Sequence, residues 1–193
     1  MPGYFREIAV RLFAKELKDS DFVYREEEEQ YAPQYILTPT GARANRVLIS
    51  GTMTEIENIG NGTDYYRARI SDPTGTFVVY AGQYQPEAAQ FLASAETPSF
   101  VTVIGKVSAF KMDDKKTMLS IRPEYIQTTD SDNQDMWIFE TAQKTYERIL
   151  KLESENIKST GLSKQDIENV LSHYKPNLND YRNMIVGALD TIS

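Results

Sequence analysis

The sequence predicts a mainly β protein whose central part, residues 45–128, is a closed barrel of five strands. Five segments of this region alternate apolar and polar side chains, as strands with one buried face do. The first and the fourth have a glycine near the middle, Gly51 and Gly105, where a strand of a small barrel must bend. A short helical segment separates the third strand from the fourth. This order is typical of the oligonucleotide-binding (OB) fold, a Greek-key barrel that binds oligonucleotides or oligosaccharides.

Residues 1–44 are expected to form an N-terminal extension that packs on the barrel. Residues 6–17 (REIAVRLFAKEL) fit a short amphipathic helix, and they also fit a strand. The acidic run at 26–29 is typical of a solvated loop. Residues 34–41 (QYILTPTG) indicate a strand followed by a turn.

The first three barrel strands are separated by clear turn signals. Strand one is expected at about residues 46–57, and the Asn-Gly pair at 61–62 then predicts a hairpin turn. Strand two follows at about 64–71. The Asp-Pro-Thr-Gly segment at 72–75 fits a type I turn, and strand three is expected at about 76–81.

The second half of the barrel begins with the short helix, expected at about 86–94. Pro86 starts it at a position where helices tolerate proline. Strands four and five are expected at about 100–111 and 116–127, joined by a charged hairpin loop. Pro123 favours an edge position for strand five, because proline cannot donate a ladder hydrogen bond.

Helices are expected after the barrel. Residues 129–158 contain one from 136 to about 157, and residues 159–193 are expected to form a helical hairpin. The long helix has a seam with the 4-3-4-3 spacing of a short coiled coil. This seam suits either a partner helix in a bundle of subunits or this chain's own barrel and last helices. Its residues are Ile138, Ala142, Thr145, Ile149 and Leu152.

The composition restricts the function classes. The net charge of −7 argues against a general nucleic-acid binder, but residues 45–128 carry only −1 of it, and residues 129–193 carry −4. The chain has no cysteine and a single histidine, His173, so no disulfide, thiolate metal site or histidine-pair metal centre is expected. No signal peptide and no run of about 18 apolar residues is visible. We therefore expect a cytoplasmic protein that needs no cofactor or metal, and one that associates with the nucleoid if it binds DNA.

Strand alternation predicts which side chains face outward from the barrel. In strand two, Ala68 and Ile70 are expected inside, because burying Arg67 and Arg69 in a small barrel would cost too much. Outward rings and cations suit a single strand, since rings stack on bases and cations contact phosphates. The candidate nucleic-acid-binding residues are Tyr65, Arg67, Arg69, Tyr80, Tyr84, Lys106, Phe110, Lys111 and Arg122.

Two alternatives accompany this assignment. The outward residues also suit an ordinary solvated face, with Phe110 packed beneath another segment of the chain. Catalysis is the other alternative, but Asp113 and Asp114 are adjacent on a hairpin tip and therefore point apart. The sequence contains no nucleophile elbow, phosphate loop or metal-ligand spacing, so we expect no enzyme activity.

Residues 33–155 resemble the middle subunit of replication protein A, and they are most similar to archaeal replication protein A-associated OB-fold proteins. The matching motifs are at residues 39–55, 65–89 (YYRARISDPTGTFVVYAGQYQPEAA), 101–110, 121–126 and 137–149. The resemblance implies single-stranded DNA as ligand and a replication protein A large subunit or homologue as partner. It also implies that Phe110 and a strand-three ring, Tyr80 or Tyr84, stack on bases, and that the helix after the barrel bundles with other subunits.

The sequence thus predicts a non-enzymatic, single-stranded DNA-binding accessory subunit of an archaeal replication protein A-type complex, acting in replication or repair. The alternative is an OB-fold adaptor that recruits a replication protein A partner without binding DNA strongly. The acidic C-terminal region favours this alternative, because its negative charge repels DNA.

Overall fold

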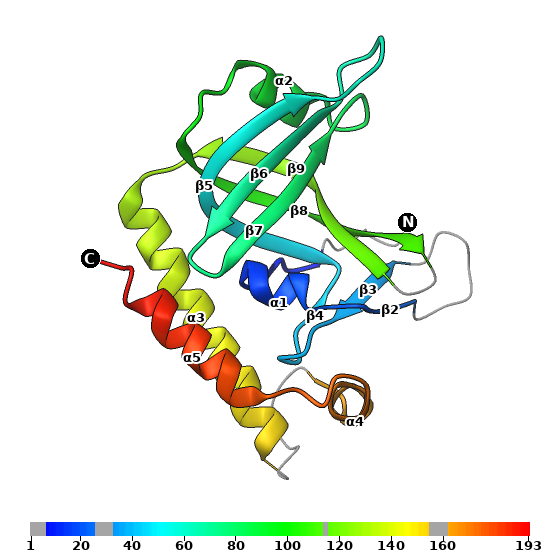
Figure 1. Ribbon diagram of the computed structural model, residues 1–193, viewed down its shortest axis with the longest axis vertical. Helices are drawn as coiled ribbons and strands as arrows, with labels where there is room; N and C mark the ends of the chain where they lie inside the picture. Colours follow the sequence, from blue (N-terminus) through cyan, green and yellow to red (C-terminus); the bar gives the residue numbers. More distant parts are fainter. Residues whose placement is uncertain (1–6, 26–32, 114–115, 155–161) are drawn as a thin grey trace, which may run out of the picture.

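The computed structural model describes residues 7–25, 33–113, 116–154 and 162–193, with the barrel at the top of the view in Figure 1 and helices below it. Six strands form the main sheet, and β8 pairs back to β5 to close it. Strands β5 to β9 make the closed barrel, which confirms the predicted five-stranded barrel. In spatial order the strands are β1 (Val10–Arg11), β5 (Arg46–Asn58), β6 (Tyr66–Asp72), β7 (Gly75–Ala81), β9 (Lys116–Thr128) and β8 (Ser99–Asp113). The short helix α2 (Pro86–Ser94) lies between β7 and β8 in the chain, as predicted.

Strand β5 closes the barrel because its two halves serve different neighbours. Residues 46–53 pair with β8, and residues 52–58 pair with β6. Gly51 lies at this exchange, where an added Cβ would come within 2.5 Å of the Ser71 carbonyl oxygen. The pairing with β6 then shifts register between Met53 and Glu55. The irregularity predicted for this strand is therefore confirmed.

The barrel interior has the predicted alternation. Ala68 and Ile70 of β6, Phe77 and Val79 of β7, and Ile121 of β9 are all at most 1% exposed. The arginines that alternate with Ala68 and Ile70 therefore face outward.

Strand β9 differs from the prediction in the role of Pro123. The strand lies between β7 and β8, so it is not an edge strand. Its pairing with β8 shifts register at Gly105, which lies opposite Pro123. Glu124 is the residue that this β-bulge leaves without a partner, so Pro123 lies where the ladder is already interrupted, a position at which proline is tolerated.

The N-terminal extension forms both a short strand and a short helix, the two elements that the sequence of residues 6–17 allows. β1 pairs with β5, and α1 (Ala14–Lys18) then packs on β7 and β9. Leu12, Phe13 and Leu17 are buried in the main core. The acidic run at 26–29 lies outside the described residues. The rest of the extension is a three-stranded sheet of β2 (Phe22–Arg25), β3 (Gln34–Leu37) and β4 (Arg43–Ala44).

The turn between β6 and β7 also holds α1. Asp72 is buried, and its Oδ2 accepts a 2.7 Å hydrogen bond from the N–H of Ala14, the first residue of α1. Its Oδ1 accepts from the N–H groups of Thr74 and Gly75. Burial raises the pKa of Asp72, and these hydrogen bonds oppose the rise. One carboxylate thus fixes both the turn and the start of α1.

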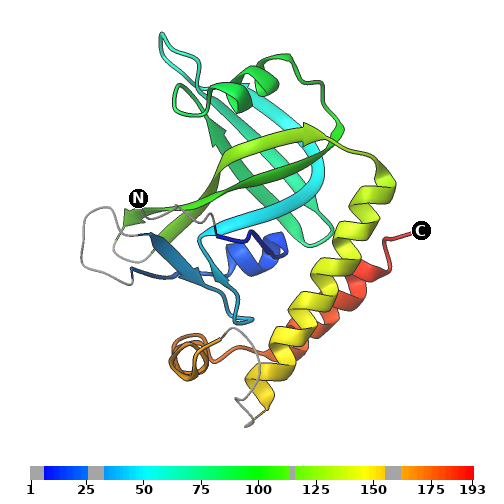
Figure 2. The same ribbon diagram turned by 180° about the vertical axis from the view of Figure 1, so that it is seen from behind.

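Three helices follow the barrel: α3 (Ser131–Glu153), α4 (Lys164–His173) and α5 (Leu178–Leu189). α3 begins at Ser131 rather than at the predicted residue 136, because Asp130 caps it by accepting a 2.8 Å hydrogen bond from the N–H of Asn133. α3 runs down from the barrel with α5 along it, and α4 lies near the small sheet (Figures 1 and 2). Among the described residues, no helix is long and apolar enough to cross a membrane.

The last two helices pack on different parts of the chain instead of on each other as a hairpin. The hydroxyl group of Tyr174, which follows α4, accepts a hydrogen bond from the N–H of Phe22 at 2.8 Å and donates one to the carbonyl of Leu37 at 2.7 Å. These contacts attach α4 to the three-stranded sheet. α5 packs on α3, and its Tyr181 and Ile185 are buried.

The five seam residues of α3 are all at most 6% exposed. Ile138, Ala142 and Ile149 belong to the main core, and Leu152 packs with Leu37 and Val170. The packing therefore corrects the assignment of the seam to a partner helix, since this chain covers it with its own barrel, extension and helices. The intramolecular alternative is the one that the structure supports.

A buried carboxylate joins the extension to α3. Glu16 is fully buried, accepts a 2.7 Å hydrogen bond from the N–H of Phe13 and forms a 2.8 Å ion pair with Arg148. The hydroxyl groups of Thr40 and Thr145 also donate to it. We name these five residues the Glu16 cluster. All of the carboxylate's partners come from three segments far apart in the chain.

Replacing Glu16 by alanine should lower the free energy of unfolding by about 3–5 kcal/mol, because Arg148 would be left buried without its partner. Urea unfolding followed by the fluorescence of Trp137, the single tryptophan, measures this. Glu147→Ala is the matched control, because its ion pair with Lys144 is solvent-exposed and should contribute less than about 1 kcal/mol. Equal losses for the two variants would contradict the prediction.

Candidate nucleic-acid interface

The outward side chains of β6, β7, β9 and β8 form a continuous surface, which we name the barrel wall. Arg67 lies opposite Tyr80, and Arg122 lies opposite Lys106. The parallel pairing of Val79 with Ile121 places Arg122 beside Tyr80. Residues from four strands therefore form one row across the wall, in the order Arg67, Tyr80, Arg122 and Lys106.

Two further rows lie below this one, toward the tip of the β8–β9 hairpin. The middle row holds small side chains on β9 and β8, Ser120 and Ser108. The lowest row holds Met118 and Phe110, which lie opposite each other. Phe110 is four residues from Lys106 along β8, a separation of about 13 Å. The wall therefore has a cationic end near α2 and an apolar end near the hairpin tip.

The charges of the wall are not equally available. Arg67 forms an ion pair with Glu57 at 2.5 Å, and Arg69 forms one with Glu55 at 2.9 Å. Lys106 and Arg122 are exposed and make no ion pair within the described part of the chain. Among the described side chains of the wall, the positive potential is thus concentrated at Lys106 and Arg122, which would attract a phosphate.

The tyrosines of the wall also differ in how accessible their rings are to a ligand. Tyr65 stacks on Tyr80, with ring centroids 5.8 Å apart and planes 11° from parallel. The Tyr65 ring also covers Gly82, where an added Cβ would lie 2.6 Å from the ring. This stack occupies one face of each ring, and Tyr65 remains 42% exposed. Tyr84 is 84% exposed, so its ring is open to a ligand.

Phe110 is 69% exposed, so it does not pack beneath another segment, which was the alternative from the sequence. An exposed phenylalanine on a strand has no role in the core, and its ring is accessible for stacking. The side chain of Lys111, and Asp114 as a whole, lie outside the described residues.

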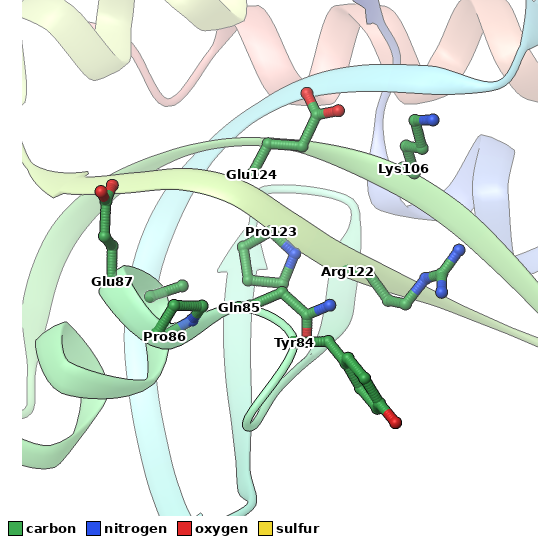
Figure 3. A pocket seen from close by; sticks show the side chains of 9 residues that line it. Tyr84, Gln85, Pro86, Glu87, Lys106, Arg122, Pro123 and Glu124 are labelled. Carbon is green, nitrogen blue, oxygen red and sulfur yellow. The ribbon is translucent and has the colours of Figure 1, made fainter.

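A pocket of about 290 Å³ adjoins the cationic end of the wall. It lies between the start of α2 and the strands β8 and β9 (Figure 3). Residues 84–88 line one side, and Lys106 and residues 122–124 line the other. Among the described residues, no group of three or more metal-ligating side chains occurs.

The sequence analysis missed the two glutamates that neutralise the wall arginines. Glu55 and Glu57 lie opposite Arg69 and Arg67 in the β5–β6 ladder. The sequence contained a signal for these ion pairs. Two glutamates spaced by two residues precede the hairpin turn at 61–62, two arginines with the same spacing follow it, and opposite charges that face each other across a hairpin form ion pairs.

No protein-family model and no curated protein matches the sequence. Among solved structures, the chain is similar to a chain of the Stn1–Ten1 complex of S. pombe, with a TM-score of 0.59 and 14% identity over 75% of this chain and 96% of that chain. The mitochondrial single-stranded DNA-binding protein Rim1 of S. cerevisiae aligns with 45% of this chain and 95% of that chain, at 17% identity and a TM-score of 0.37. The first of these likenesses, together with the closed barrel, shows that the chain has the OB fold with C-terminal helices.

Proposed function

We propose that the chain is a non-enzymatic, single-stranded DNA-binding accessory subunit of an archaeal replication protein A-type complex, acting in replication or repair. The observation that carries the proposal is the barrel wall, where unpaired cations lie within one surface with accessible aromatic rings. Cations that contact phosphates and rings that stack on bases are the two interactions by which single strands are bound without sequence preference.

The arrangement also favours single strands over duplexes. The rings are at both ends of the wall, with Tyr65 and Tyr84 near α2 and Phe110 near the hairpin tip. A base reaches such rings only when it is unpaired and unstacked. The described side chains of the wall include two unpaired cations, so affinity should depend on stacking as much as on charge.

Phe110→Ala should weaken the binding of a fluorescein-labelled oligo-dT by about 1–3 kcal/mol, the contribution of one stacked base. Fluorescence anisotropy at two salt concentrations measures the affinity. Phe139→Ala is the matched control, because Phe139 is a 52% exposed ring on α3, away from the wall. Unchanged affinity for Phe110→Ala would remove Phe110 from the site, and no binding by the wild-type chain would refute the proposed function.

Replacing Glu55 and Glu57 by glutamine should strengthen oligo-dT binding, because Arg67 and Arg69 would lose their competing partners. Two additional phosphate contacts would make the slope of log K against log salt more negative by about 1.4. The doubly substituted control Glu147→Gln, Glu168→Gln makes the same change in net charge on the helices. An equal effect of both double variants would show that net charge alone is responsible.

A second candidate function, an OB-fold adaptor for a replication protein A partner, is favoured by the outer face of α3. Met136, Phe139, Tyr146 and Leu150 are 44–58% exposed and recur at the spacing of one helix face. Contiguous exposed apolar patches often mark protein interaction sites. This stripe flanks the buried seam of α3 and stays exposed, so it is the face that a partner subunit would contact.

Replacing Phe139 and Tyr146 by glutamate should abolish binding to a purified replication protein A large-subunit homologue and leave oligo-dT binding unchanged. Gel filtration of the mixture and anisotropy of the single chain measure the two properties. The matched control is Phe110→Glu, which alters the wall and should affect DNA only. Partner binding by the double variant at the wild-type level would exclude the stripe.

A further inference from the structure

The pocket at the cationic end of the barrel wall has a rigid boundary on its α2 side. The N–H of Gln85 donates a 2.9 Å hydrogen bond to the carbonyl of Gly82, which closes a tight turn around Tyr84. Pro86 follows as the first residue of α2. The backbone on both sides of Tyr84 is therefore held in place, and its 84% exposed ring extends from this turn into solvent.

The opposite boundary comes from the strands. The β-bulge at Pro123 brings β9 so close to β8 that a Cβ on Gly105 would lie 2.4 Å from the Arg122 carbonyl oxygen. Lys106 and Arg122 face each other across this narrow pair of strands. Two cationic side chains therefore stand side by side at the pocket, on backbone that cannot shift easily.

The acidic groups of the pocket do not cancel these two charges. Glu124 is engaged in a 2.5 Å ion pair with Arg46. Glu87 lies at the helix side of the pocket, on the other side of the view from Lys106 and Arg122 (Figure 3). The strand side is therefore positively charged, and it suits an anion that a guanidinium group and an ammonium group can bind together.

From this geometry we propose that the pocket binds one nucleotide of a single strand, with its phosphate between Lys106 and Arg122 and its base stacked on Tyr84. The inference rests on the proposed function and adds a specific subsite to it. The pocket volume of about 290 Å³ is near the lower end for small-molecule sites, so it suits a single nucleotide. The middle row of the wall, with the small side chains of Ser108 and Ser120, then provides a surface along which the DNA strand continues toward Phe110.

Tyr84→Ala should weaken oligo-dT binding roughly five- to 150-fold, and Tyr84→Phe should bind like the wild type, because stacking needs only the ring. Replacing both Lys106 and Arg122 by alanine should reduce the salt slope by about 0.7, the value for the one phosphate that the two side chains bind together. The matched control, Arg67→Ala with Arg69→Ala, should change this slope little, because both charges are already paired with glutamates. All these residues are outside the core, and Trp137 fluorescence verifies folding.

Thymidine monophosphate titrated into the ¹⁵N-labelled chain gives a direct measurement of the pocket. We expect shifts of the amides at residues 82–88, 106 and 122, and weaker shifts in the Tyr84→Ala variant. If the wild type binds oligo-dT but the Tyr84 and Lys106–Arg122 variants bind equally well, the pocket proposal fails and the proposed function stands. If the wild type does not bind oligo-dT, both fail. Shifts with oligo-glutamate but not with the nucleotide would overturn the proposal in favour of an acidic-peptide site.

Discussion

The buried ion pair between Glu16 and Arg148 is the contact on which the arrangement of this molecule depends. A buried carboxylate is costly unless its charge and its hydrogen-bonding capacity are satisfied. Here the N–H of Phe13 and two threonine hydroxyl groups complete its partners. These partners come from the extension and from α3, so Glu16 is satisfied only when both are docked. Docking therefore behaves as one cooperative event.

This docking decides which surfaces remain free. α1 covers one end of the barrel, and α3 packs beside β5, where Trp137 donates a 3.0 Å hydrogen bond to the carbonyl of Leu48. Outward side chains of β6, β7, β9 and β8 remain exposed beside these contacts, and they form the barrel wall. The seam of α3 packs inside the chain, whereas the stripe of Met136, Phe139, Tyr146 and Leu150 remains exposed. The surface proposed for DNA and the surface proposed for a partner therefore lie on separate faces of the chain.

Within the wall, the effective charge is set by pairing rather than by the number of cations. Arg67 and Arg69 supply two of the four cations among the described side chains of the wall, but both are paired with glutamates of β5. Lys106 and Arg122 are unpaired within the described part of the chain, and they lie beside Tyr84, which is 84% exposed. A chain with a net charge of −7 can therefore still present a localised site for an anionic strand.

The sequence by itself determined the barrel, because alternation, glycine bends and turn residues act locally and agree with one another. It also determined that Arg67, Lys106 and Phe110 face outward, since a strand has only two sides. Tertiary structure alone decided that the seam of α3 packs inside the chain, because an apolar helix face does not specify its partner. It also decided that Pro123 lies at a bulge and that Arg67 is neutralised while Arg122 is not. Each of these outcomes depends on which segments, remote from each other in the sequence, lie side by side and in which register. No local sequence pattern encodes that.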